Sequence, residues 1–347
     1  MMSPTPSLSA TVLRDLTSLR NLSPEWTALW EKCEGLTPFQ RPEWLVPWTE
    51  AFKPHPLHVV QVRHGRELVA LAPMFAYESS GQTILAPIGA GITDYLDWLI
   101  LPGYASQAID AILNTLADSD CNWDRMDLPD LLPASTLIEH SRRFNFKQAA
   151  HEVCPVVELL SCAAERKAVI PDRQRKNLRT ARNRTTRAGE ARIEVADATQ
   201  LPEFLHAMFR LHTARWQGFG MPGVLSEVTI QDFHQRSAPG LLRAGLLRFY
   251  GLRFCGDLIA VLHTLWGRNT VYCYLQGFDP AYSFFSPGLQ IIAAVIEDAI
   301  RAGKLAVDFL RGREAYKYSW GARDRSTTRL QLSRRELVQH SSPRVAA

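Results

Sequence analysis

Two side chains in the C-terminal half have the chemistry of a general base. His212 stands three residues before Arg215 on a helix predicted for Leu201 to Trp216, so the two share one helix face. A histidine exchanges protons near neutral pH, although a lone histidine on a helix also fits a purely structural role. Glu314, in the segment after the last predicted strand of this half, is a comparable base candidate.

Asp308 is a third candidate, and its position is unusual. It lies inside the apolar strand predicted for Leu305 to Leu310. A carboxylate there is costly unless it is paired. Arg311 and Arg313 are close enough in sequence to be partners, so a salt bridge and a base role both remain open.

A helix predicted to begin at Ser286, Pro287 and Gly288 could hold a phosphate. Serine is a favoured N-cap and proline a favoured first helical residue. The helix lies between strands predicted for 270–275 and 305–310, which makes a β-loop-α-β unit. Backbone N–H groups and the helix dipole at such a start suit an anion.

A basic helix is predicted over residues 171–188. Residues 166–187 contain nine Lys or Arg and one acid, Asp172. Leu178, Ala181 and Ala188 form a narrow apolar stripe, which fits either a solvated helix with a packed seam or an anion-binding face. The candidate anions are CoA phosphates, an RNA, an acidic glycan and a membrane surface. The segment lacks the aromatic residues that single-stranded nucleic-acid sites interleave with charge.

Size and composition indicate a globular protein of two domains. The chain has 347 residues, 46% of them hydrophobic and 21% charged, with a net charge of +4. We expect neither a membrane-spanning helix nor a signal peptide, and therefore a cytoplasmic protein. The six cysteines form no CxxC pair, and we see no metal-ligand cluster or nucleophile elbow.

Strand and helix patterns predict mixed α/β sheets in both halves. A helix over 102–116 followed by a strand with Asp127 loosely repeats the later helix followed by a strand with Asp308. We expect a poorly ordered start at 1–24, an N-terminal domain at 25–160, a C-terminal domain at 161–335 and a tail at 336–347.

An ordered set of short strings carries a family resemblance over roughly residues 25–325. The strings are PFQRPEWL (38–45), DYLD (94–97), LHTARW (211–216), GFDP (277–280), SPG (286–288), DFLRGREAYK (308–317) and WG (320–321). Their order and spacing resemble the CelD/BcsL-type acetyltransferases linked to cellulose and exopolysaccharide biosynthesis. That family belongs to the GNAT superfamily and is similar to the Fem-type aminoacyl transferases.

The resemblance implies two GNAT-like domains in a Fem-like tandem, with the acyl-donor site in the C-terminal one. It implies acetyl-CoA as co-substrate and transfer to an amine or hydroxyl by direct attack in a ternary complex. The acceptor would be a sugar, a polysaccharide precursor or an amino compound, and no metal is required.

The resemblance also assigns candidate roles to residues. Tyr316 would be the general acid, and Lys317 would contact substrate or stabilise an oxyanion. Donor binding would fall to Ser286, Pro287, Gly288 and Leu289, and substrate binding to Asp94, Tyr95, Arg215, Trp216 and Asp279. For Asp279 a second role is open, that of holding a turn before Pro280.

The chain departs from the GNAT pattern at one point, and this keeps two alternatives open. The usual pyrophosphate loop, Q/R-x-x-G-x-G/A, is absent, and the segment 286–288 supplies only one glycine. One alternative is Fem-type aminoacyl transfer from tRNA, gripped by the basic helix. The other is a non-catalytic accessory protein of exopolysaccharide biosynthesis.

Overall fold

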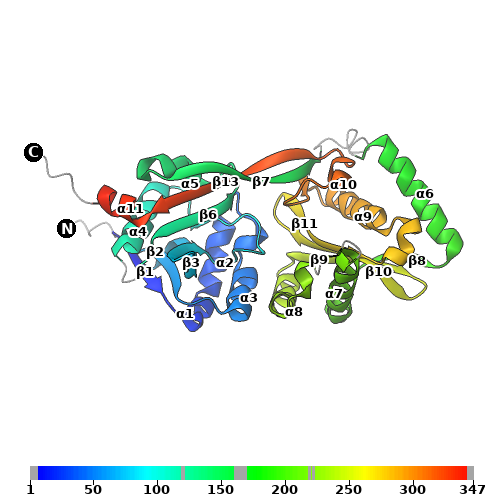
Figure 1. The fold of residues 1–347 in the computed structure, drawn as a ribbon, viewed down its shortest axis with the longest axis horizontal. Helices are drawn as coiled ribbons and strands as arrows, with labels where there is room; N and C mark the ends of the chain where they lie inside the picture. The colour runs from blue at the N-terminus through cyan, green and yellow to red at the C-terminus, as the bar shows by residue number, and fades with distance from the viewer. Residues whose placement is uncertain (1–6, 119–121, 160–169, 218–219, 221–222, 342–347) are drawn as a thin grey trace, which may run out of the picture. The chain divides into compact units, whose positions relative to one another are not determined.

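The computed structural model describes residues 7–118, 122–159, 170–217, 220 and 223–341. The chain divides into two compact units: residues 1–152 with 326–347, and residues 153–325 (Figure 1). Both are built from strands and helices, so the α/β prediction is confirmed. The domain boundary expected at 161 falls outside the described residues. The tail joins the first unit because strand β13 (Arg323–Ser333) pairs with β6 (Arg125–Leu131).

Unit 1 is a mixed sheet with strand order β1-β2-β3-β4-β6-β13 and a short β5 paired with β3. Its strands β1 to β5 are Leu8–Leu13, Leu57–His64, Glu67–Ser79, Gln82–Pro87 and Leu99–Ile100. Its helices α1 to α5 are Leu16–Asn21, Ser23–Lys32, Pro42–Phe52, Ala105–Asp118 and Thr136–His140, and α11 is Arg334–Ser341. The 3-10 turns η1 and η2 are Pro38–Gln40 and Ser141–Phe144.

The N-terminal segment differs from the poorly ordered start that the sequence indicated. Leu8–Leu13 forms β1 because it pairs antiparallel with β2 along its whole length. Asp15 then caps α1 by accepting a hydrogen bond from the Ser18 N–H at 2.9 Å. Pairing with β2 thus orders the segment LSATVL within a stretch that the sequence indicated to be poorly ordered.

The helix predicted for 102–116 is confirmed as α4. Its apolar face packs against β1, β2 and β3 through a core that includes Ile109, Ile112, Leu113 and Leu116. The chain then enters β6, which runs parallel to β4.

Unit 2 is a mixed sheet with strand order β7-β12-β11-β10-β9-β8. Strands β7 to β12 are Lys147–Glu158, Ala191–Val195, Leu247–Phe254, Asp257–Trp266, Thr270–Phe278 and Ala306–Asp308. Helices α6 to α10 are Asp172–Ala188, Leu201–Gln217, Val228–Arg243, Pro287–Arg301 and Ala315–Tyr318, with the 3-10 turns η4 at Val224–Ser226 and η5 at Pro280–Phe285. Helix α9 covers one face of this sheet, and α7 and α8 cover the other (Figure 1).

The β-loop-α-β unit predicted near the C-terminus is confirmed as β11, α9 and β12, with β11 and β12 parallel. Strand β12 is shorter than expected because Leu310 adopts a left-handed φ of 57°. Helix α9 is buried beyond its predicted apolar stripe, since α6 packs on it; Gln290 of α9 donates to Thr185 of α6 at 2.8 Å.

The basic helix is confirmed as α6. Gln174, Leu178, Ala181 and Thr185 form its buried seam, while Ala188, which we had placed in the apolar stripe, is exposed. Within the described residues, none of the helices is both long enough and apolar enough to cross a membrane.

Candidate active site

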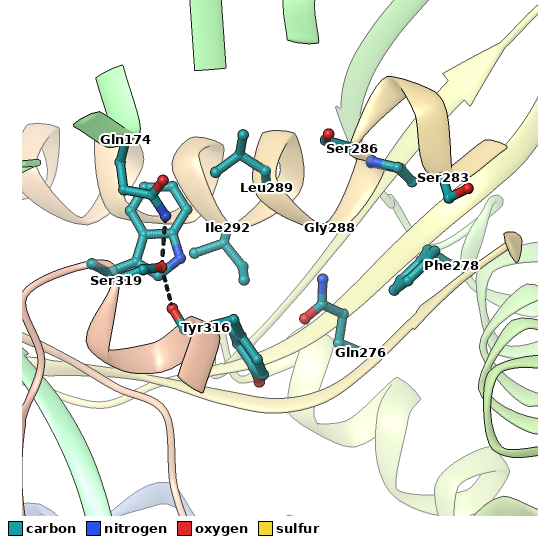
Figure 2. Close-up of a pocket in the computed structure, with 12 residues that line it drawn as sticks. Gln174, Gln276, Phe278, Ser283, Ser286, Gly288, Leu289, Ile292, Tyr316 and Ser319 are labelled. Carbon is teal, nitrogen blue, oxygen red and sulfur yellow. Dashed lines mark hydrogen bonds between the residues drawn. The ribbon is translucent and has the colours of Figure 1, made fainter. Parts of the chain in front are cut away.

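A cavity of about 280 Å³ opens in unit 2 beside the start of α9 (Figure 2). Its walls come from β11, η5, α9, α10 and the first turn of α6. The lining residues are Gln174, Gln276, Phe278, Ser283, Ser286, Pro287, Gly288, Leu289, Ile292, Tyr316, Ser319 and Trp320. The cavity thus brings together the four predicted donor-binding residues and the predicted acid, Tyr316.

Strand alternation explains why β11 serves this cavity. Gln276 and Phe278 line it, and Gly277 between them faces helix α7 on the other side of the sheet. A Cβ at Gly277 would lie 2.7 Å from the His212 backbone nitrogen, so α7 packs directly on the strand there. Glycine is needed for this close approach.

The start of α9 is open toward the cavity. Ser286 occupies the N-cap in a left-handed conformation, with φ of 50°, and its carbonyl accepts the N–H groups of Leu289 and Gln290. The Ser286 side chain makes no cap hydrogen bond, so the expected side-chain cap does not form. A Cβ at Gly288 would lie 2.8 Å from Nε2 of Gln276, so the glycine keeps a side-chain amide close to the helix terminus.

The sheet also opens at this point. The pairing of β11 with β12 ends at Tyr272 and Asp308, whereas β11 continues to Phe278. Strand β11 carries one extra residue, Tyr274, because Thr264 pairs with Cys273 and His263 with Leu275. Beyond Tyr272 the strand therefore leaves its parallel partner and runs along the cavity.

The far wall comes from the segment after β12. Ser319 accepts a hydrogen bond from Gln174 at 2.7 Å and donates one to the Tyr316 carbonyl (Figure 2). The Tyr316 ring packs edge-on against Phe309, with 6.2 Å between the centroids. Tyr316 is therefore held in the cavity wall and partly exposed to it.

Lys317 is buried beneath the loop that precedes α10. Its ammonium donates to the carbonyls of Leu310, Arg311 and Gly312 at 3.2, 2.6 and 3.1 Å. The Glu314 carboxylate lies 2.9 Å from the same nitrogen. These contacts hold a loop in which Leu310 and Gly312 have positive φ, and they occupy both Lys317 and Glu314 structurally.

Asp308 is fully buried at the end of β12. Its Oδ1 accepts the Leu310 N–H at 2.8 Å, and Arg325 lies 3.6 Å from Oδ2. Arg325 is a partner that we had not considered; Arg313 pairs instead with Asp324 at 3.3 Å. Asp308 thus has the paired environment that its burial demands.

Burial and the Asp308 charge act on the neighbouring residues of β11. Burial first, and Asp308 second, raise the pKa of the Tyr272 phenol and of the Cys273 thiol. Cys273 therefore stays protonated at neutral pH and is a weak nucleophile.

His212 is on the other face of the sheet from the cavity. It is buried on α7, close to His234 of α8, whose own pKa is lowered by burial and by the His263 and His212 side chains. The structure therefore does not bring His212 to the predicted donor site.

The remaining predicted substrate residues are Asp279, two residues of unit 1 and two residues of α7. Asp279 caps η5 by accepting the Ala281 N–H at 2.9 Å. Asp94 and Tyr95 belong to unit 1 and are 4% and 1% exposed. Arg215 and Trp216 are in α7, but their side chains lie outside the described residues.

Sequence reasoning missed several lining residues, of which Gln276 and Gln174 are the most polar. The signal for Gln276 was a polar side chain directly after the end of the strand predicted for 270–275 and directly before a glycine. The signal for Gln174 was its place on the seam of the basic helix, one turn before Leu178. Among the described residues, no group of three or more His, Cys, Asp or Glu side chains is placed to hold a metal ion.

Residues 172–318, which contain the whole cavity lining except Ser319 and Trp320, match a family model described as an acetyltransferase (GNAT) domain. No curated protein matches the chain significantly. The sequence-based prediction of a GNAT-type acyltransferase is confirmed at this level of class.

Solved structures match over nearly the whole chain at low identity. FemX is 11% identical, with a TM-score of 0.68, over 91% of this chain and 97% of its own. The C-terminal domain of a putative lysylphosphatidylglycerol synthetase from Agrobacterium fabrum is 11% identical, with a TM-score of 0.56, over 92% and 95%. L-PGS from Bacillus licheniformis is 11% identical, with a TM-score of 0.57, over 88% and 90%. These likenesses concern the fold, and the predicted pair of GNAT-like α/β units is confirmed.

Proposed function

Since residues 172–318 form a GNAT acyltransferase domain, we propose that the chain moves an acyl group, in the simplest case acetyl from acetyl-CoA, to an amine or hydroxyl. The acceptor is a sugar, a polysaccharide precursor or an amino compound, in the manner of the CelD/BcsL-type enzymes of exopolysaccharide biosynthesis. The observation that carries this proposal is the cavity at the start of α9, which joins a helix terminus, a glutamine amide and a tyrosine.

Donor binding follows from the chemistry of that terminus. Pro287 has no N–H and the Leu289 N–H donates to the Ser286 carbonyl, so the Gly288 N–H, together with the helix dipole, is what this terminus offers to an anion such as the diphosphate of CoA. Gly288 has no Cβ, which would lie 2.8 Å from Nε2 of Gln276, so the Gln276 amide can stay beside this terminus. The apolar side chains of Leu289, Ile292 and Phe278 suit the uncharged arm and acyl end of the donor.

The transfer itself needs no covalent enzyme intermediate. The acceptor nitrogen or oxygen attacks the thioester carbonyl carbon, the C–S bond breaks, and the acceptor proton is lost to solvent. Tyr316 gives its proton to the departing thiolate and regains one from solvent, so the products are the acylated acceptor and free CoA. The protonated state of Cys273 favours this direct route over an acyl-cysteine.

Calorimetric titration with acetyl-CoA tests the proposal, with free CoA and a tRNA mixture titrated alongside. We expect saturable acetyl-CoA binding that Gly288→Trp abolishes. The new Cβ meets only the flexible end of Gln276, so this variant should fold. Val228→Trp, at a position 77% exposed on α8, adds the same bulk elsewhere and should bind normally. Binding would justify an acceptor screen by thiol release.

One observation favours a second donor. Helix α6 exposes several arginines, which fits Fem-type aminoacyl transfer from tRNA. In that case tRNA binds tightly, its affinity falls steeply as the salt concentration rises, and acetyl-CoA does not bind. If neither acetyl-CoA nor tRNA binds, both transferase proposals are contradicted and a non-catalytic accessory protein is favoured.

A further inference from the structure

An exposed aromatic side chain lies in η5, between two residues that line the donor cavity. Phe284 is 64% exposed, and it lies in η5 between Ser283 and Ser286, which both line the cavity. The guanidinium carbon of Arg184 is 4.7 Å from the centre of its ring. A single exposed phenylalanine is ordinary. A phenylalanine next to a binding cavity that also has an arginine over its ring can stack with another flat group.

Helix α6 brings more positive charge to the same flank. Its buried seam, at 174, 178, 181 and 185, is followed around the helix by a parallel stripe of exposed residues, namely Arg173, Asn177, Thr180, Arg184 and Arg187. Among the described residues, no carboxylate lies within ion-pair distance of these three arginines. Arg182, on the opposite flank, is neutralised by Glu297 at 3.1 Å.

The small volume of the cavity indicates that part of the donor lies outside it. A volume of about 280 Å³ is at the lower limit of small-molecule sites, so it takes only the reacting end of a donor as long as CoA. The rest of the donor must continue past the start of α9, toward η5 and α6. That tail carries a purine base and phosphates, which are the groups that an exposed ring and unpaired arginines recognise.

We propose that Phe284 and Arg184 form the seat for the purine base of the donor, with Arg187 of the same stripe, one turn further along α6 from Arg184, attracting its ribose phosphate. The seat deepens the proposed function and rests on it. In CoA the adenosine is the end remote from the thioester, whereas in an aminoacyl-tRNA the terminal adenosine carries the acyl group itself, so the seat is proposed for a CoA-type donor alone.

The test compares donors that carry or lack the nucleotide. Acetyl-CoA, acetyl-phosphopantetheine and adenosine 3′,5′-bisphosphate are titrated into the full chain and into Phe284→Ala and Arg184→Gln. Each substitution should weaken acetyl-CoA and bisphosphate binding about 10-fold, as loss of one stacking contact does, and leave acetyl-phosphopantetheine unchanged. Arg184→Gln should also flatten the salt dependence.

Two control variants match these changes in kind. Arg182→Gln removes the same charge from the other flank of α6, and Val228→Ala trims an exposed apolar side chain on α8. Both should bind every ligand as the parent does. If Arg182→Gln weakens acetyl-CoA as much as Arg184→Gln, the effect is general charge and the seat is wrong.

The results separate the seat from the proposed function. Normal acetyl-CoA binding by Phe284→Ala and Arg184→Gln overturns the seat and leaves the transferase proposal intact. If the parent does not bind acetyl-CoA, the transferase proposal fails. Titration with adenosine 3′,5′-bisphosphate then tests the seat separately. Bisphosphate binding by the parent that is lost in Phe284→Ala supports the seat, and no bisphosphate binding by the parent overturns the seat. If tRNA binds, acetyl-CoA does not, and Phe284→Ala loses the tRNA, Phe284 contacts RNA and the seat for a CoA-type donor is overturned.

Discussion

Both units contain a parallel strand pair joined through a helix, β4-α4-β6 in unit 1 and β11-α9-β12 in unit 2. In unit 1 the connection before α4 folds into the interior: Thr93 and Tyr95 are each 1% exposed, and the Trp44 indole donates to Thr93 at 2.9 Å. In unit 2 the connection is the short η5, and a cavity remains beside α9. The same topology can therefore serve as core or as binding site, depending on whether the chain fills its own crossover.

The largest effect on stability should come from removing a buried side chain that packs against the connection before α4. Trp44 is fully buried and packs edge-on against Phe39, with 5.1 Å between the ring centroids. Trp44→Ala should lower the free energy of unfolding by about 3–5 kcal/mol, because it removes a large buried side chain and leaves a cavity. Urea unfolding followed by circular dichroism measures this.

Trp44→Phe, which keeps a ring but loses the indole N–H, should cost less than Trp44→Ala. Acetyl-CoA affinity of the folded fraction should not change in either variant. If the fully folded Trp44→Ala variant loses affinity for acetyl-CoA, unit 1 takes part in donor binding. That result would contradict the proposal that the donor site belongs to unit 2.

Two glycines in unit 2 should separate stability from binding. Gly277→Ala places a Cβ 2.7 Å from the α7 backbone and should cost about 1–3 kcal/mol, because α7 must shift. Gly288→Ala meets only the Gln276 amide, so it should weaken donor binding while leaving the denaturation midpoint nearly unchanged. Thermal melts and acetyl-CoA titrations of both variants give the comparison. Equal losses of stability would mean that the cavity wall is as tightly packed as the α7 interface.

The fold was largely predictable because its signals are local. Helices α4, α6, α7 and α9 follow from apolar spacing and from the prolines and glycines near their ends. The strand at Leu8–Leu13 was missed because its order comes from pairing with β2, about 50 residues away along the chain. Strand β12 ends earlier than predicted, because Leu310 has a left-handed φ that the local sequence pattern does not predict.

The candidate site was predictable only in part. The segment 286–289 and Tyr316 were found, since a helix start and a family resemblance point to them. Lys317 had the features of a catalytic lysine in the sequence, yet its ammonium binds three carbonyls of the preceding loop. Gln174 reaches the cavity from another helix, a contact that depends on how α6 packs against α9 and not on spacing along the chain.

Buried histidines with a lowered pKa lie in both units, His234 and His263 in unit 2 and His58 in unit 1, so both units should lose stability in acid, and unit 2 should lose more. Burial lowers the pKa of His263 from 6.5 to about 3 and lowers that of His234 as well. The unfolded chain binds these protons first, so stability is complete above pH 6.5 and falls with acidification, by up to about 1.4 kcal/mol per pH unit for each histidine. His263→Leu should reduce this slope in urea unfolding series between pH 7 and 5. An unchanged slope would mean that the histidines become charged without cost.

Asp97 in unit 1 should give the smallest effect, because a single group is involved and it keeps its hydrogen bonds. Burial raises the pKa of its carboxyl from 3.8 to about 7, although Ser135 and the Trp98 N–H, at 2.8 Å, favour the charged form. The folded chain therefore holds this proton longer than the unfolded one, so stability decreases as pH rises from about 4 to 7. Asp97→Asn cannot ionise and accepts the same N–H. Its stability relative to the parent should be greater at pH 8 than at pH 5, whereas an equal difference at both pH values would show that the carboxylate is stabilised in place.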